Sequence, residues 1–126
     1  MIQIHIVLIF HKNAIEDFGG SHGVRDWEGL KSALERPFQT FDQQELYNDA
    51  VSKAAALLES ILLNHPFVDG NKRSAYSIAR YFLRKNNMDI FATENEKYDF
   101  IIAIASGNMD FDSIIDWLSK HTAIIQ

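Results

Sequence analysis

Two stretches of helical periodicity, separated by Pro66, constrain most strongly what this chain can fold into. In the first, from about residue 43 to residue 64, apolar side chains recur every three or four residues, as along one face of a helix. They are Leu46, Ala50, Ala54, Leu57 and Ile61, with Leu58 and Leu62 beside them. The second, from residue 71 to about residue 85, carries Ala75, Ile78, Ala79, Phe82 and Leu83 on one side. Because proline blocks a continuing helix, two helices joined by a short loop are predicted.

The N-terminal part of the chain is ambiguous. Ile2, Ile4, Ile6, Leu8 and Phe10 alternate as in a strand, whereas Ile4, Leu8, Ile15 and Phe18 fit a helical stripe. The pair Gly19-Gly20 is typical of a helix stop. Asp26 is a cap for a helix that runs to about residue 35, where Pro37 ends it, and residues 36–42 are predicted to form a loop.

The C-terminal part contains two further helix starts. Thr93 and Glu96 match a capping box, and Gly107 ends the helix that it opens. The side chains predicted to be buried on this helix are Tyr98, Ile101, Ile102 and Ala105. Asp110 caps a last helix with Phe111, Ile114, Ile115 and Leu118, and residues 89–92 are a short extended piece. About six helices with short connections predict an all-α bundle, and 126 residues fit a single domain over 1–126.

The composition excludes several classes of function. The net charge of −5 argues against direct DNA binding, which depends on clustered basic residues. The chain has no cysteine, so disulfides and thiolate metal sites are excluded. No apolar run approaches the roughly 18 to 20 residues of a membrane span, and residues 2–10 lack the basic flank of a signal peptide. We therefore expect a cytoplasmic protein with no membrane partner.

The junction between the two central helices concentrates groups suited to binding an anion. A helix start presents free backbone N–H groups and the positive end of the helix dipole, and Gly70 allows the backbone to approach a ligand closely. Lys72 and Arg73 in the first turn oppose that dipole, at a cost of roughly 0.3 to 1 kcal/mol each. A bound anion would offset this cost. The sequence therefore predicts a phosphate site at Gly70, Asn71, Lys72 and Arg73.

Two more residues of this junction suggest catalysis. Asp69 offers a carboxylate beside the phosphate site, as Mg²⁺ prefers, and His65 can accept a proton near neutral pH. A base, a metal ligand and an anion cradle within nine residues are the parts that phosphoryl or nucleotidyl transfer needs. Each of these residues also has a structural interpretation that remains open. Residues 69–71 could form an ordinary turn between helices, and His65 could be a surface or cap residue. Lys72 and Arg73 could form a solvated face of the helix.

The string His65-Pro66-Phe67-Val68-Asp69-Gly70-Asn71-Lys72-Arg73 resembles the signature of the Fic/Doc superfamily. The Fic form is H-x-F-x-[DE]-G-N-G-R-x-x-R, and the Doc branch has H-x-F-x-[DN]-[AG]-N-K-R. The resemblance extends to residues 19–26 and 82–87, and it implies a Fic/Doc-like helical bundle with the active-site loop between two central helices. Two departures from the Fic form favour the Doc branch: Lys72 replaces a glycine, and Tyr76 replaces the second arginine.

The resemblance to the Doc branch implies a function and a role for each motif residue. The function is Mg²⁺-dependent transfer of the γ-phosphate of ATP to a hydroxyl of a translation elongation factor, which blocks translation. His65 would be the base, Asp69 the Mg²⁺ ligand, and Gly70, Asn71, Lys72 and Arg73 the phosphate site. Phe67 would anchor the loop, and residues 36–42 would be the flap that lines up the target. AMP transfer of the Fic sort and a catalytically idle binding module remain alternatives.

The same resemblance implies an antitoxin whose disordered C-terminal segment folds into a helix in an apolar groove of the toxin. Phe10, Phe18, Trp27 and Trp117 are surplus apolar side chains for the core or for such a groove. The inhibitory pattern [ST]-x-x-x-E-[GN] of Fic enzymes is absent from the sequence. His11 is predicted to have a hydrogen-bonded structural role, and Arg80 either extends the phosphate site or lies in a solvated face.

Overall fold

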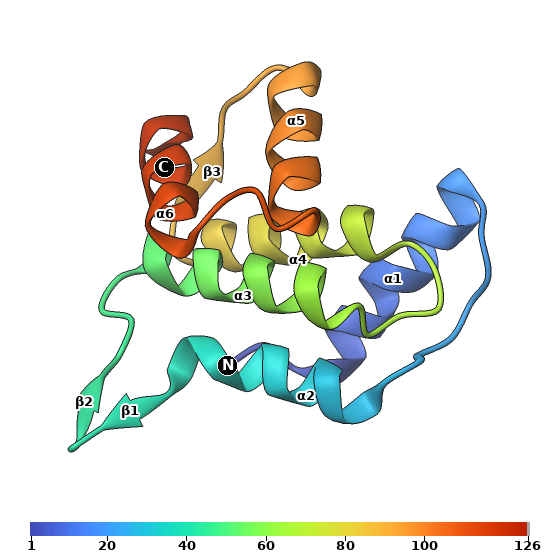
Figure 1. Cartoon of the computed structure of the whole chain (residues 1–126), viewed down its shortest axis with the longest axis horizontal. Helices are drawn as coiled ribbons and strands as arrows, with labels where there is room; N and C mark the ends of the chain where they lie inside the picture. The colour runs from blue at the N-terminus through green and yellow to red at the C-terminus, as the bar shows by residue number, and fades with distance from the viewer. Residues whose placement is uncertain (126) are drawn as a thin grey trace.

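The computed structural model describes residues 1–125, and within that range the chain is an all-α bundle of six helices, as predicted (Figure 1). The helices are α1 (Ile4–Phe18), α2 (Trp27–Glu35), α3 (Ala50–Asn64), α4 (Asn71–Lys85), α5 (Glu94–Ala105) and α6 (Phe111–His121). A 3₁₀ turn, η1 (Arg36–Phe38), follows α2. Two antiparallel pairs of short strands complete the fold: β1 (Thr40–Phe41) with β2 (Gln44–Glu45), and β3 (Met88–Ile90) with β4 (Thr122–Ile124). Of the helices in residues 1–125, none combines the length and the apolar character that a membrane span requires.

Helices α3 and α4 form the centre of the bundle and run in opposite directions (Figure 1). Helix α3 is surrounded by α2, α4, α5 and α6, while α1 packs on α4. Small residues at 54–56 let neighbouring helices approach α3 closely, and all three are fully buried. The large side chains Leu57, Leu58, Ile61, Ile78 and Leu83 form one core with Leu30 of α2 and Leu118 of α6. The rigid pair α3–α4 therefore fixes both ends of the loop that joins them.

Helix α3 begins at Ala50, so the predicted start at residue 43 is wrong. Asp49 ends the irregular segment because its Oδ1 accepts a hydrogen bond from the backbone N–H of Ser52 at 2.8 Å, which completes a capping box. The hairpin turn before it places Asp42 and Gln43 at positive φ, a conformation that no helix allows. Leu46 is 51% exposed and lies outside the core stripe.

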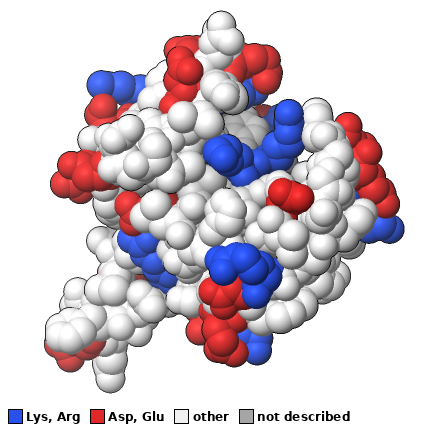
Figure 2. All heavy atoms as spheres, turned by 45° about the vertical axis from the view of Figure 1, so that its right-hand side comes forward, with Lys and Arg blue, Asp and Glu red and all other residues white. Residues whose placement is uncertain are grey.

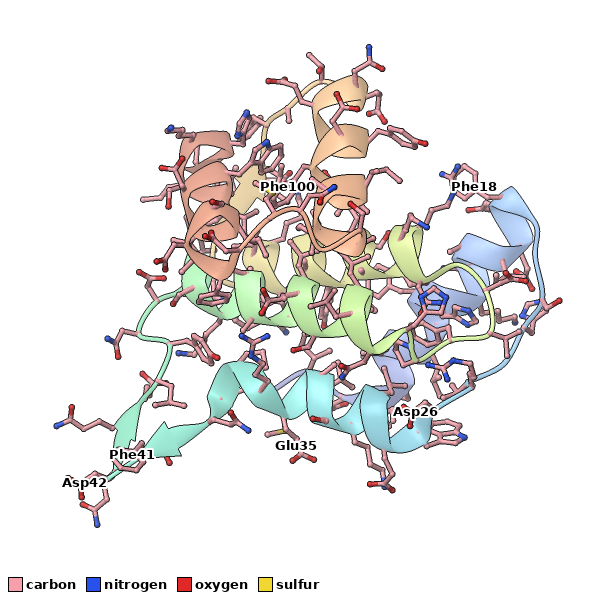
Figure 3. The ribbon with its side chains drawn as sticks, viewed as in Figure 1. Phe18, Asp26, Glu35, Phe41, Asp42 and Phe100 are labelled. Carbon is pink, nitrogen blue, oxygen red and sulfur yellow. The ribbon has the colours of Figure 1, made fainter. Side chains whose placement is uncertain are left out.

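The hairpin β1–β2 lies at the opposite end of α3 from the loop after Asn64 (Figure 1). Its tip carries the exposed Phe41 next to Asp42 (Figure 3). Arg36 holds its base on the middle of α3 through bonds of 2.9 Å to Glu59 and to Ser60. Residues 36–42 therefore lie away from the loop, and their assignment as the flap that lines up the target stays a prediction.

The ambiguous N-terminus is helical, and Gly19, with φ of 87°, ends α1 as expected. Asp26 caps α2 and Asp110 caps α6, each accepting a backbone N–H three residues later. The capping box of Thr93 and Glu96 also forms.

The predicted buried face of α5 is partly wrong. Tyr98 is 66% exposed, and Ile102 and Ala105 are only half-buried. The core face consists of Phe100, Ile101 and Ile104, and Phe100 stacks on Trp117 of α6 with ring centres 3.8 Å apart. The buried face lies one position from the predicted one, because apolar residues lie on both sides of Ile101 and periodicity fits either face.

Buried Asp89 on β3 ties the end of α4 to the second strand pair. Its carboxylate accepts bonds of 2.8 and 3.0 Å from Arg80 and 2.7 Å from Arg84. Arg80 therefore lies on a solvated face, with its side chain 48% exposed, and its guanidinium pairs with Asp89 instead of extending the phosphate site. The hydrogen bond from Arg80, followed by those from Ile90 and Arg84, holds the pKa of Asp89 far below its ordinary value of 3.8.

We expect Asp89→Asn to lower the free energy of unfolding by about 1.5 to 3 kcal/mol at neutral pH, the usual worth of hydrogen bonds to a charged group. A lowered pKa in the fold contributes stability above the ordinary carboxyl pKa, and this stability is lost as the pH falls toward the folded-state value. Urea unfolding of both proteins at neutral pH and below the ordinary pKa should therefore show the difference narrowing in acid. An equal difference at both pH values would contradict the assignment.

Candidate active site

His65 ends α3 in the left-handed conformation, with φ of 52° and ψ of 56°. A non-glycine residue there costs about 1 kcal/mol, and such strain is found most often at functional positions. The side chain is exposed, while the backbone N–H donates to Ile61 O at 3.1 Å and the carbonyl accepts from Arg25. The fold thus fixes the backbone of His65 and leaves its imidazole facing solvent.

Phe67 and Asn71 hold the middle of the loop. Phe67 is fully buried, as an anchor must be. The backbone N–H of Phe67 donates to Asn71 Oδ1 at 2.9 Å, and Asn71 Nδ2 donates back to Phe67 O at 3.0 Å. The side chain of Asn71 is buried, and both of its polar atoms are occupied. The side chain of Asn71 therefore braces the loop, while its backbone N–H lies at the helix start where an anion would bind.

Asp69 is exposed on the loop, and its Oδ2 accepts a bond of 2.8 Å from the backbone N–H of Ser21. Within residues 1–125 no cluster of three or more histidine, cysteine, aspartate or glutamate side chains could hold a metal ion. A single carboxylate still fits Mg²⁺, which commonly takes one or two and fills its other positions with phosphate and water oxygens. Asp69 is therefore a suitable Mg²⁺ ligand only together with a bound phosphate.

The start of α4 has the features of an anion cradle. Gly70 takes φ of 74°, and a Cβ there would lie 3.0 Å from Ile15 Cδ1, so a side chain would be strained and crowded. The first backbone bond of the helix runs from Ser74 N to Gly70 O, so the N–H groups of residues 71–73 precede it. The first turn contains no acidic residue. Anions bind such helix starts through these N–H groups and the helix dipole.

A cleft of about 680 Å³ opens beside this cradle, between α4 and α5. Its walls include Lys72, Arg73 and Tyr76 from α4 and Lys97 and Tyr98 from α5. The Arg73 guanidinium lies 3.5 Å from the ring centre of Phe18, at the end of α1 (Figure 3). Basic side chains gather on this face of the molecule (Figure 2). The volume is in the range that small-molecule ligands occupy, and the walls combine aromatic and cationic groups.

The glycine-rich segment 19–26 packs against the loop, a contact that the sequence did not predict. Gly23 O accepts from Val68 N at 3.0 Å, and Pro66 O accepts from the backbone N–H groups of Arg25 and Asp26. A Cβ on Gly20 would lie 3.2 Å from Asp69 Cβ. The sequence feature that indicates such a contact is the presence of three glycines within residues 19–23, since glycine allows two backbones to approach closely.

His11 has the hydrogen-bonded structural role predicted for it, and its partner lies in the loop. Its ring is buried, its Nε2 bonds to Asp69 O at 2.8 Å, and it stacks on Phe67 with ring centres 4.0 Å apart. Since a carbonyl oxygen accepts, Nε2 carries the proton. Helix α1 and the segment after it thus hold the loop from one side.

Comparisons with known proteins agree with this geometry. The family model described as Fic/DOC family matches residues 2–83, which include the whole loop. "Toxin Doc" of Mycolicibacterium smegmatis is 38% identical over 111 residues, 86% of this chain and 85% of that protein. "Protein kinase doc" of Escherichia phage P1 is 29% identical over 114 residues, 90% of this chain and 89% of that protein. The resemblance seen in residues 65–73 is therefore confirmed, and the chain belongs to the Fic/DOC family.

Proposed function

We propose that the chain is a Doc-type toxin that transfers the γ-phosphate of ATP to a hydroxyl group of a protein. The observation that carries this proposal is the loop itself, with an exposed imidazole at one end and the N–H groups of a helix start, flanked by Lys72 and Arg73, at the other. Phosphoryl transfer depends mainly on positioning and charge neutralisation, so a base and a phosphate cradle on one fixed loop suit it. The name of one relative, a protein kinase, supports this reaction, and the name of the other supports a toxin.

In this mechanism, His65 accepts the proton of the attacking hydroxyl while the hydroxyl oxygen bonds to the γ-phosphorus. The bond between that phosphorus and the bridging oxygen breaks, and ADP leaves. The backbone N–H groups at the start of α4, with Lys72 and Arg73, neutralise charge on the phosphate oxygens. Asp69 would hold Mg²⁺, which would add positive charge beside the phosphate oxygens.

Lys72 favours phosphate transfer over AMP transfer, because it brings a charged side chain to the position where the Fic form has glycine. The test is intact-mass analysis of purified translation elongation factors after incubation with the chain, ATP and Mg²⁺. A gain of one phosphate that is absent with His65→Ala supports the proposal. A gain of one AMP supports the alternative reaction, and no gain with any factor supports the idle binding module.

The proposed clamp predicts two separate binding defects. Lys72→Ala should weaken binding of Mg²⁺·ATP by roughly tenfold or more, because one cation no longer faces the phosphates. Asp69→Asn should instead raise the Mg²⁺ concentration required for ATP binding. Titration calorimetry at several Mg²⁺ concentrations measures both effects, with Lys31→Ala as a control for the loss of an exposed lysine on α2. Unchanged affinity in both variants would leave the clamp without support.

A toxin of this kind requires restraint, and we propose an antitoxin whose C-terminal segment folds into a helix on this chain. Of the apolar side chains considered for its groove, Phe18 and Trp27 are exposed and Phe10 and Trp117 are half-buried. Phe18 lies on the rim of the α4–α5 cleft with the exposed Tyr98, so this cleft is the best candidate groove. Co-expression with the small gene upstream or downstream of the gene for this chain should relieve its toxicity. Toxicity that neither of these genes relieves would contradict the proposed antitoxin.

A further inference from the structure

Arg25 bonds to the end of α3 where the catalytic loop begins. Its Nε donates to His65 O at 2.9 Å, and its Nη2 donates to His65 O at 2.6 Å and to Asn64 O at 2.8 Å. No carboxylate within residues 1–125 forms a salt bridge with this guanidinium. The side chain is therefore bonded to the backbone carbonyls of the last residue of α3 and of its cap, His65.

These carbonyls belong to the group that the end of a helix leaves without partners. They also carry the negative end of the helix dipole, so a cation is favourable there. Many helices solve this problem with a glycine in the left-handed conformation, but here that position holds His65. Arg25 thus supplies from outside the helix the bonds that fix a strained, non-glycine residue.

Arg25 is itself held in place. Its backbone N–H donates to Pro66 O at 2.7 Å, and Asp26 N donates to the same oxygen at 3.0 Å. The next residue, Asp26, caps α2 by accepting from Gly29 N at 2.9 Å. The guanidinium therefore extends from the fixed start of α2 and not from a free surface loop.

We infer that Arg25 is a positioning residue that sets the backbone, and through it the imidazole, of His65. This inference rests on the proposed role of His65 as the base. The phosphate end of the loop is held separately, because Ser21 and His11 bond to Asp69 and the side chain of Asn71 bonds to Phe67. Loss of the Arg25 side chain should therefore disturb the base and leave the phosphate site intact.

The kinetic test compares wild type, Arg25→Ala, Arg25→Lys and the control Lys31→Ala. Arg25→Ala should lower kcat about tenfold, as expected for the loss of a charge-assisted contact, with the KM for ATP changed by less than about twofold. Arg25→Lys should restore part of kcat, because an ammonium can still donate to these carbonyls but lacks the second donor nitrogen with which Arg25 Nε holds His65 O. An unchanged kcat in Arg25→Ala, or a rise in KM equal to the fall in kcat, would overturn the inference.

A second measurement does not depend on activity. The backbone and imidazole NMR signals of His65 should shift in Arg25→Ala, while the amide signals of Asp69 and Lys72 stay within the change seen for Lys31→Ala. If wild type transfers no phosphate, the proposed function fails, and these spectra still decide whether Arg25 positions His65. Unmoved His65 signals would refute the positioning role whatever the reaction proves to be.

Discussion

Replacement of His65 by alanine should reduce the rate of phosphate transfer by roughly 10²- to 10⁴-fold, the usual worth of a positioned general base. The same change should leave the free energy of unfolding within about 1 kcal/mol of wild type, because exposed side chains away from special contacts contribute little. The imidazole of His65 is exposed and forms no hydrogen bond with residues 1–125, so its removal disrupts no packing. Activity and stability are thus expected to separate.

Single-turnover transfer rates and urea unfolding midpoints check this prediction. His65→Asn is the matched variant for the backbone, since asparagine tolerates the left-handed conformation and lacks a group that titrates near neutral pH. His5→Ala controls for the loss of an exposed histidine on α1. If His65→Ala unfolds at a much lower urea concentration while His65→Asn does not, His65 serves the backbone conformation and the role of base is wrong.

The sequence predicted the features that local interactions decide. Pro66 and Gly70 bound the loop, and Asp26, Thr93 and Asp110 cap the helices, because each of these effects involves residues within four positions. The predicted start of α3 was wrong because the periodic apolar pattern also extends to residues before Asp49. In the structure, the cap at Asp49 and the hairpin turn before it determine where the helix begins. Helix periodicity alone cannot detect such an override.

Contacts between distant residues could not be predicted from periodicity or caps. His11 and Asp69 are 58 positions apart, Ser21 and Asp69 are 48 apart, and Arg25 and His65 are 40 apart. The motif indicated which residues to propose for the site, whereas the surrounding segment that holds the loop became evident only in the folded chain. The role of Asn71 illustrates the difference, since its place in the motif suggested a phosphate ligand and its contacts identify a loop brace.

Asn71 should therefore behave in the opposite way to His65. Asn71→Ala removes the partners of the Phe67 N–H and carbonyl, and each buried backbone group left unsatisfied costs about 1 to 3 kcal/mol. We expect the free energy of unfolding to fall by about 2 to 5 kcal/mol, a large share of the 5 to 15 kcal/mol typical of a small domain. Transfer activity should fall with the folded fraction and with the order of the loop.

Asn71→Asp separates the two bonds, because a carboxylate of the same size still accepts from Phe67 N but cannot donate to Phe67 O. This variant should also be destabilised, since it places a charge against a carbonyl in a buried position. Asn13→Ala, at an exposed position on α1, is the control. Urea unfolding together with ATP titration of the folded protein distinguishes a loop brace from a phosphate ligand. If Asn71 braces the loop, both variants should unfold at a lower urea concentration than wild type. If Asn71→Ala instead keeps the wild-type midpoint and loses only ATP affinity, the side chain binds phosphate, and the bonds to Phe67 do not hold the loop.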